Sequence, residues 1–134
     1  MADSPSPRYL AVKALMMPRD TNPYGTIFGG VLLSYIDQAG AMGARHEVRR
    51  SGWPDRPFVT VAMKSVEFHQ PVFVGDSVSF FTEVTRVGRT SITTQVTVEA
   101  DRDGKTVKLT EAEVTYVAIE QGDEGRQPAV IREP

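Results

Sequence analysis

The feature that most restricts the fold of this chain is that only one segment has the pattern of a long helix. Residues 27–48 carry apolar side chains around almost the whole circumference of a helix, which predicts a helix that is buried on most sides. Within it, Gly40 and Gly43 each lower the intrinsic helix propensity by about 1 kcal/mol relative to alanine. Two glycines at such positions indicate that another element packs very close to the helix.

Most of the remaining sequence has the pattern of strands. Residues 8–17 are interpreted as a first strand, and residues 18–25, which are rich in turn formers, as a loop. Residues 101–104 carry the signal of a hairpin turn. The strands predicted after the helix form a meander of four and span residues 58–68, 77–87, 90–100 and 105–119.

One helix combined with a run of strands predicts an α+β domain, in which a curved antiparallel sheet of about five strands wraps around one long central helix. A chain of 134 residues suits a single domain of this kind, which we place at residues 8–120. Residues 1–7 are expected to form a disordered lead, and residues 121–134 a loose tail. Because one sheet around one helix leaves a face or an edge uncovered, we expect a homo-oligomer.

The charge and cysteine content exclude several classes of function. With 15 Lys and Arg against 17 Asp and Glu, the formal net charge is −2, so there is no overall basic field to attract nucleic acid. The absence of cysteine removes disulfides, thiolate chemistry and cysteine-ligated zinc, and permits the cytoplasmic location that we predict. No signal peptide is expected at the N-terminus. The longest apolar stretch, residues 27–44, contains Asp37 and glycines and would make a poor membrane span.

Three segments of the chain carry a resemblance to a known family. They are MPRDTNPYGTIFGGVLLSYID at residues 17–37, VEFHQPVFVGD at residues 66–76 and VGRTSI at residues 87–92. Their order and spacing resemble the hotdog-fold acyl-CoA thioesterases, specifically the YciA-like group and the related cytosolic acyl-CoA hydrolases. The first segment is the most specific, whereas the second is shared by many hotdog proteins and indicates fold more than activity.

The resemblance implies the hotdog fold, with the long helix enclosed by the curved sheet. In this family two protomers pair their sheets edge to edge, and we expect a dimer at least, assembled further into a tetramer or a hexamer made of three dimers. The implied activity is hydrolysis of acyl-CoA to a free fatty acid and CoA. The substrate brings the CoA, and no metal or other cofactor is implied.

Asp37 and Asn22 are the main catalytic candidates. Asp37 is a lone carboxylate in an otherwise apolar helix, and desolvation there would make it a better base near neutral pH. The resemblance implies that it acts as a general base toward water, or as a nucleophile through a mixed anhydride. It also implies that Asn22, from the opposite protomer, orients the water or the thioester carbonyl. The alternatives are a partly exposed polar residue for Asp37 and a turn or cap residue for Asn22.

Gly29 and Gly30 open the predicted helix after Phe28. Free backbone N–H groups at a helix start can polarise a thioester carbonyl, and glycine lets a ligand approach the backbone closely. We therefore predict an oxyanion hole here, with Gly30 the preferred donor. The alternative is simply a flexible helix start.

The third segment of the resemblance predicts a region that binds CoA. Arg86 and Arg89 could pair with phosphates, while Thr90 or Ser91 could donate hydrogen bonds. Lys64 is a further, weaker candidate. The alternative is a solvated surface residue, which arginine in a hairpin usually is.

The two histidines are interpreted as structural. His46 lies near the helix end, where it interacts with the helix dipole or solvent, and His69 precedes a proline at a strand end. Neither has partners at metal-ligand spacing in the sequence, so no metal site is predicted.

Two other functions are weighed against thioester hydrolysis. A non-catalytic module on the same fold would bind or sense acyl-CoA, but such a binder would need neither Asn22 nor Asp37. A different hotdog enzyme would act on another acyl carrier or on an aromatic acyl-CoA. The presence of both polar residues favours the acyl-CoA thioesterase.

Overall fold

A computed structural model describes residues 7–133 and contains one long helix and one antiparallel sheet, as expected. The helix starts two residues later than predicted and continues three residues further. The elements, in chain order, are β1 (Tyr9–Leu15), the short 3-10 helix η1 (Pro18–Asp20), α1 (Gly29–Ser51), β2 (Phe58–Phe68), β3 (Ser77–Val87), β4 (Ser91–Arg102), β5 (Lys105–Gly122) and β6 (Gly125–Pro128).

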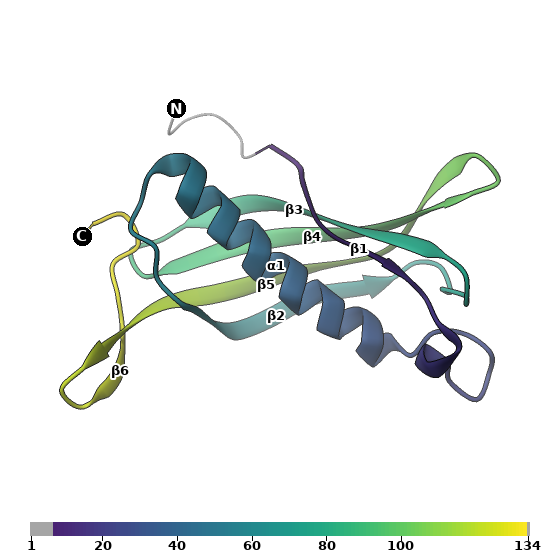
Figure 1. The fold of residues 1–134 in the computed structure, drawn as a ribbon, viewed down its shortest axis with the longest axis horizontal. Helices are drawn as coiled ribbons and strands as arrows, with labels where there is room; N and C mark the ends of the chain where they lie inside the picture. The colour runs from purple at the N-terminus through teal and green to yellow at the C-terminus, as the bar shows by residue number, and fades with distance from the viewer. Residues whose placement is uncertain (1–6, 134) are drawn as a thin grey trace.

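The order of the strands differs from the predicted meander. The sheet has the order β1-β3-β4-β5-β2, with every pair antiparallel, and β6 pairs with the end of β5 (Figure 1). Short turns do join β3, β4 and β5 as neighbours, but β2 lies on the far edge beside β5. Local alternation predicts where strands lie but not which strands pair, which is why the place of β2 was predicted wrongly.

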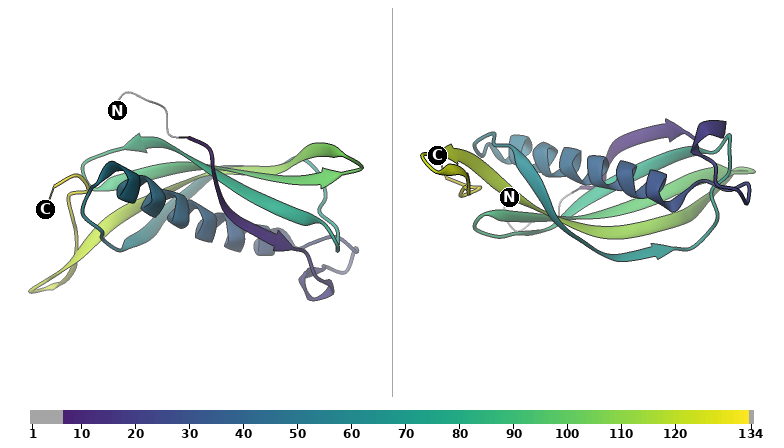
Figure 2. Two further views of the ribbon diagram at one scale, coloured as in Figure 1. Left: turned by 45° about the horizontal axis from the view of Figure 1, so that its top comes forward. Right: turned by 90° about the horizontal axis from the view of Figure 1, so that it is seen from below.

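Helix α1 lies across one face of the curved sheet, as the views in Figure 2 show. A Cβ atom added to Gly43 would overlap the side chain of Thr82, and one added to Gly40 would overlap the hydroxyl of Tyr116 and crowd Thr94. The prediction of very close packing at the two glycines is therefore confirmed. The sheet and the inner face of α1 enclose a continuous core that includes Ile36, Ala39, Ala44, Phe80, Ile92, Val96, Val98, Leu109, Val114 and Ala118.

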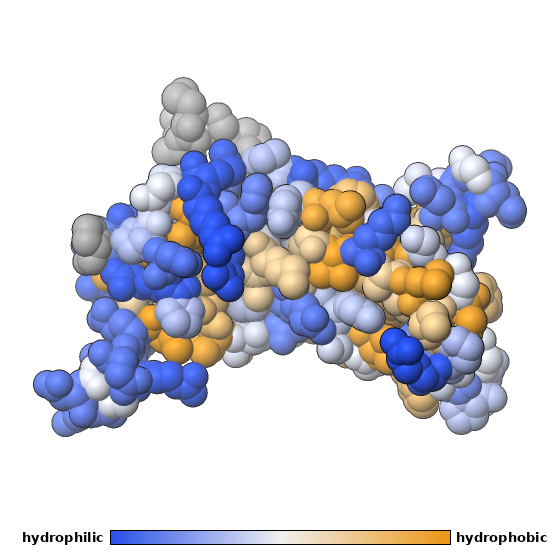
Figure 3. Space-filling view, viewed as in Figure 1, coloured by the Kyte–Doolittle hydropathy of each residue, from blue (hydrophilic) through white to orange (hydrophobic). Residues whose placement is uncertain are grey.

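The outer side of α1 is less buried than the sequence predicts. Met42 is 45% exposed, and Ser34 and Gln38 are also exposed. A single sheet covers only one side of a helix, so the apolar residues on the other side remain at the surface of the protomer. Figure 3 shows apolar patches between hydrophilic ones on this face of the molecule.

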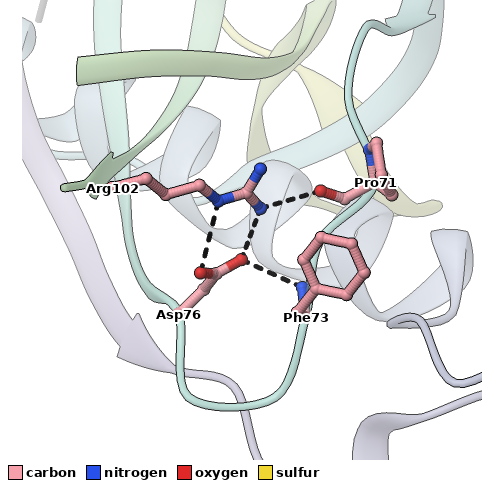
Figure 4. A network of polar contacts seen from close by, with 4 residues as sticks. All are labelled: Pro71, Phe73, Asp76 and Arg102. Atoms are coloured by element: carbon pink, nitrogen blue, oxygen red, sulfur yellow. Dashed lines mark hydrogen bonds and ion pairs between the residues drawn. The ribbon is translucent and has the colours of Figure 1, made fainter. Parts of the chain in front are cut away.

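The connection between β2 and β3 is held by Asp76 (Figure 4). Its carboxylate accepts hydrogen bonds from the guanidinium of Arg102, the shortest at 2.6 Å, and from the backbone N–H of Phe73 at 2.9 Å. Arg102 also donates to the carbonyl of Pro71 at 2.8 Å. Burial opposes the ionisation of Asp76, but these contacts outweigh it and hold the pKa of the carboxyl below its ordinary value. These contacts give the PVFVGD part of the second segment a structural role.

The C-terminal residues form ordered structure, so the predicted loose tail is wrong for this part of the chain. β6 completes a hairpin with β5, and Ala129 and Ile131 are buried. Their backbone N–H groups donate to the carbonyls of Ala118 at 2.8 Å and Arg89 at 2.9 Å. The short apolar run at residues 129–131 is the sequence signal that was missed. The predicted disordered lead falls almost wholly on residues 1–6, outside the described residues.

Within residues 7–133, no helix has the length and apolar character needed to cross a membrane.

Candidate active site

The carboxylate of Asp37 is held by two hydroxyl groups in the middle of α1. Thr60 on β2 donates from its hydroxyl to Oδ1 of Asp37 at 2.7 Å. The hydroxyl of Tyr116 on β5 donates to the backbone carbonyl of Asp37 at 2.6 Å and lies 3.3 Å from Oδ1. Among the described residues, none donates a hydrogen bond to the second oxygen, Oδ2. Asp37 is half-buried, so Oδ2 is free to interact with a water molecule or a substrate.

Tyr116 is suited to remain a hydrogen-bond donor at this position. Its side chain is 1% exposed, and burial together with the negative charge and hydrogen bond of Asp37 raises the pKa of the phenol above its ordinary value. The hydroxyl therefore keeps its proton and fixes both the backbone and the side chain of Asp37. Sequence reasoning missed Tyr116 and Thr60 because only the long-range pairing of β2 with β5 brings them to the helix.

The sheet places these residues in one row. Thr60 lies opposite Tyr116, which in turn lies opposite Ile92 on β4. Directly after Thr60, the register of β2 shifts, so that Val61 is an extra residue and the next pair is Ala62 with Thr115. This bulge explains why apolar and polar residues alternate only in part along β2. Because of it, Thr60 and Met63 both lie on the same face of the sheet as their buried partners on β5.

Asn22 makes its hydrogen bonds within its own loop. Its side-chain oxygen accepts from the backbone N–H groups of Tyr24 at 2.9 Å and Thr26 at 3.1 Å, and its amide nitrogen donates to the hydroxyl of Thr26 at 2.8 Å. Gly25 provides the left-handed backbone of this turn, with φ of 85°. Within one protomer, Asn22 thus organises the loop before α1 and makes no hydrogen bond to Asp37.

The start of α1 borders an open pocket. The helix begins at Gly29, so its first backbone N–H groups have no partner within the helix. A Cβ atom added to Gly30 would meet nothing within 4 Å, whereas one on Gly29 would lie 3.4 Å from the ring of Phe68. A pocket of about 340 Å³ adjoins this end and is lined by Thr26, Ile27, Gly29, Leu32, Phe68, His69, Gln70, Pro71 and Val72. The space that an oxyanion hole needs is therefore present.

The predicted CoA-binding residues divide into two places. Arg86, Arg89, Thr90 and Ser91 lie together at the end of β3, in the turn and at the start of β4. Lys64 is exposed on β2 opposite Glu113, in the half of that strand that runs away from this turn, so the structure does not bring it to the group.

The pocket beside this turn contains an arginine that sequence reasoning missed. It has a volume of about 350 Å³ and is lined by Val87, Gly88, Arg89, Val130, Arg132 and Glu133. Arg132 comes from the segment that was interpreted as a loose tail, so nothing in the sequence linked it with Arg89.

The histidines make specific contacts. His46 stacks on Tyr9 with ring centroids 3.9 Å apart, which ties β1 to α1. Nε2 of His69 lies 2.9 Å from Glu111 and 3.8 Å from Glu67, and the ligand atoms of these three residues all lie within 4.8 Å of one another. This grouping corrects the expectation that His69 has no partners at metal-ligand spacing. Lys108 already pairs with Glu111, and its ammonium supplies positive charge to the cluster.

Comparison with known proteins identifies the family. The model of the thioesterase superfamily matches residues 24–107. The chain belongs to the thioesterase superfamily. A curated member of the superfamily, the acyl-CoA thioester hydrolase YciA of Salmonella typhimurium, is 36% identical over 116 residues, which cover 83% of each chain.

Solved structures of other superfamily members share the fold. The hexameric hotdog-fold thioesterase of Campylobacter jejuni has a TM-score of 0.77 and 40% identity, with coverage of 90% of this chain and 89% of that one. The acyl-CoA hydrolase of Staphylococcus aureus, solved with butyryl-CoA and CoA, has a TM-score of 0.78 and 26% identity over 94% of this chain and 72% of that one. That hydrolase has also been solved with one aspartate, and separately one asparagine, replaced by alanine. The predicted hotdog fold and YciA-like resemblance are thus confirmed.

Proposed function

We propose that this chain is an acyl-CoA thioesterase that uses Asp37 as its catalytic carboxylate. The observation that carries the proposal is the contact set of Asp37: two hydroxyl donors, Thr60 and Tyr116, hold one side of the residue and leave Oδ2 free. The names of the superfamily relatives support the substrate class.

In the general-base route, Oδ2 of Asp37 takes a proton from a water molecule whose oxygen attacks the thioester carbonyl carbon. The backbone N–H groups of Gly30 and Gly29 at a helix start stabilise the oxyanion of the tetrahedral intermediate. The carbon–sulfur bond then breaks, and the CoA thiolate receives the proton from Asp37. In the nucleophilic route, Asp37 itself attacks the carbonyl to form a mixed anhydride, which water then hydrolyses.

Asn22 enters this proposal through the dimer. Within one protomer its side chain is used by its own loop, so we propose that Asn22 of the partner subunit approaches Asp37 and orients the water or the carbonyl. In the Staphylococcus aureus hydrolase, the aspartate and the asparagine that were replaced are separated by the same number of positions as Asn22 and Asp37. This equal spacing supports the assignment of the pair.

The dimer and its further assembly are part of the same proposal. Strand β2 pairs only with β5 among the described strands, so its outer edge can pair with another protomer. The Campylobacter jejuni relative is a hexamer, and we propose a hexamer of three dimers here. Light scattering on the purified protein tests this assembly, and a monomer that still hydrolyses acyl-CoA would contradict the shared site. The cytoplasm remains the predicted location.

The first experiment measures thiol release from a panel of acyl-CoAs, from acetyl to palmitoyl. We expect wild type to hydrolyse some of them and Asp37→Ala to lose at least about a thousandfold in kcat, as removal of a catalytic base or nucleophile commonly does. Asp123→Ala, a change at an exposed carboxylate in the β5–β6 turn, serves as the matched control. Near-wild-type turnover by a folded, dimeric Asp37→Ala would exclude Asp37 as the reacting carboxylate.

A second arm separates the two chemical routes. After a single turnover in ¹⁸O-labelled water, label found in Asp37 by mass spectrometry would identify a mixed anhydride that water opens at the Asp37 carbonyl carbon, whereas a general base leaves Asp37 unlabelled and places the label in the fatty acid. Wild type that binds acyl-CoA but releases no thiol from any substrate would favour the sensing module instead.

A further inference from the structure

A basic pocket lies between the β3–β4 turn and the C-terminal segment, residues 129–133. Arg89 comes from the turn and Arg132 from the segment, and both line a space of about 350 Å³. Neither arginine takes part in a salt bridge with any of the described residues. Two guanidinium groups without carboxylate partners beside one pocket are a suitable arrangement for an anionic ligand.

The C-terminal segment is fixed in place on three sides. Ala129 and Ile131 are buried and hydrogen-bonded to the sheet. Arg56, from the loop after α1, donates to the carbonyls of Val130 at 3.1 Å and Glu133 at 2.8 Å. Arg132, between these two carbonyls in the chain, therefore lies on a backbone that is hydrogen-bonded on both sides of it.

The side chain of Arg132 is also positioned. Its guanidinium lies over the ring of Trp53, 5.2 Å from the centroid, and donates to the carbonyl of Val87 at 3.3 Å. These partners orient the group without neutralising its charge. Glu133 also lines the pocket, but it is exposed, so solvent and salt screen its repulsion of an anion.

The sheet relates this pocket to Asp37. The row that holds Asp37 runs through Thr60, Tyr116 and Ile92. Arg89 lies in the β3–β4 turn, three residues before Ile92, so the pocket lies beyond the end of β4 that is nearest to this row. In acyl-CoA an extended pantetheine arm separates the thioester from the phosphates, so a phosphate site is expected away from Asp37 rather than beside it.

We propose that Arg132 and the C-terminal segment form, together with Arg89, a pocket that binds a phosphate of the CoA portion of the substrate. This inference rests on the proposed function. It assigns a substrate-binding role to residues outside the part of the chain that the superfamily model matches. A guanidinium can donate two parallel hydrogen bonds to a phosphate, so a pair of them gives both charge and geometry.

The test compares one acyl-CoA with the matching acyl-pantetheine, which has the same thioester but no phosphate. Arg132→Gln and Arg89→Gln are each expected to raise KM for acyl-CoA about tenfold with little change in kcat, since binding that is uniform through the reaction is lost. KM for acyl-pantetheine should stay unchanged in both variants. Arg126→Gln, on the β5–β6 hairpin and outside the lining of the pocket, is the matched control and should change neither KM. Acyl-3′-dephospho-CoA shows whether the 3′-phosphate or the diphosphate is bound.

If Arg132→Gln has the same KM for acyl-CoA as wild type, the proposed pocket is overturned, while the thioesterase proposal stays intact. An equal rise in KM for acyl-pantetheine would also overturn it, because the segment would then support only the structure. If wild type hydrolyses neither substrate, the proposed function fails, and calorimetry with CoA and pantetheine decides the pocket separately. The pocket is supported if Arg132→Gln binds CoA more weakly than wild type but binds pantetheine equally well. It is overturned if the variant binds CoA as tightly as wild type, or if wild type does not bind CoA.

Discussion

The middle and the start of helix α1 differ in how completely one protomer surrounds them. In the middle, Gly40 and Gly43 are in direct contact with side chains of the sheet, and two hydroxyl groups hold Asp37. At the start, Gly30 has open space beside it, and Phe28 is 49% exposed. Glycine occurs in both places for different reasons: in the middle of α1 no larger residue fits, whereas the open space at Gly30 is proposed to receive a ligand or a partner protomer.

This difference indicates which part of the site is preformed. The carboxylate in the middle of α1 has its position fixed by the fold of a single chain. The groups at the start, including the loop that Asn22 organises, are proposed to meet their reaction partners only in the dimer. Replacing glycine by alanine should therefore have opposite consequences in the middle and at the start of α1.

The largest effect is expected for Gly43→Ala. The added methyl group would overlap Thr82, which is buried, so the helix or the strand must shift, and overpacking of this kind costs about 3 kcal/mol. Urea denaturation should show this loss in the free energy of unfolding. A variant as stable as wild type would mean that α1 can move away from the sheet without cost.

Gly30→Ala sharpens the comparison in the opposite direction. The methyl group meets no atom of the protomer, so stability should stay the same or rise by about 0.5 kcal/mol from the better helix propensity of alanine. We expect kcat/KM for acyl-CoA to fall by about thirtyfold, roughly 2 kcal/mol, because the methyl group enters the proposed oxyanion hole. Full activity would show that the open space at Gly30 is not used by the substrate.

Thr60→Val tests the fixed half of the site. The change keeps the shape of the side chain and removes the hydrogen bond to Oδ1 of Asp37, so we expect about a tenfold fall in kcat, or roughly 1.4 kcal/mol. Stability should change little because Thr60 is exposed on an edge strand in the protomer. Thr97→Val, on the opposite face of β4, is the control, and an equal fall in both variants would refute a specific role for Thr60.

The smallest effect is the pH dependence of stability that Asp76 gives to the β2–β3 connection. This connection supports the start of the helix, since the N–H of Ile27 donates to the carbonyl of Val72 at 2.8 Å. Because the pKa of Asp76 is lower in the folded than in the unfolded chain, its stabilisation is present above the unfolded pKa and is lost as pH falls through the folded pKa. Wild type should therefore be more stable than Asp76→Asn by about 1 kcal/mol near neutral pH, and the difference should disappear well below about pH 4. A pH-independent difference in thermal unfolding would contradict this account.

The parts of the structure that were predicted from sequence depend on local patterns. The helix, the turn at residues 101–104 and the close approach at Gly40 and Gly43 all follow from a few neighbouring residues. The place of β2 and the pairing of Arg89 with Arg132 in one pocket depend on contacts between distant segments, which periodicity does not encode.

The candidate site shows the same limit. Asp37 was identified from its apolar setting, but its two hydroxyl partners were not, because neither Thr60 nor Tyr116 stands out within a strand of mixed residues. The catalytic roles of Asp37, Asn22 and the helix-start glycines remain predictions for the experiments above.

The bulge at Val61 has a consequence for how relatives of different length are aligned. Removing one residue there would leave Thr60 opposite Tyr116 and Met63 opposite Val114, so both faces of the strand would be preserved. The register of β2 shifts a second time between Lys64 and Glu67, so a one-residue deletion there would also be absorbed, whereas a deletion between regular pairs would exchange the inner and outer faces of the strand. Gaps between homologous sequences in this strand are therefore expected to collect at these two positions, and a comparison that forces strict alternation through Val61 would misplace the threonine that supports Asp37.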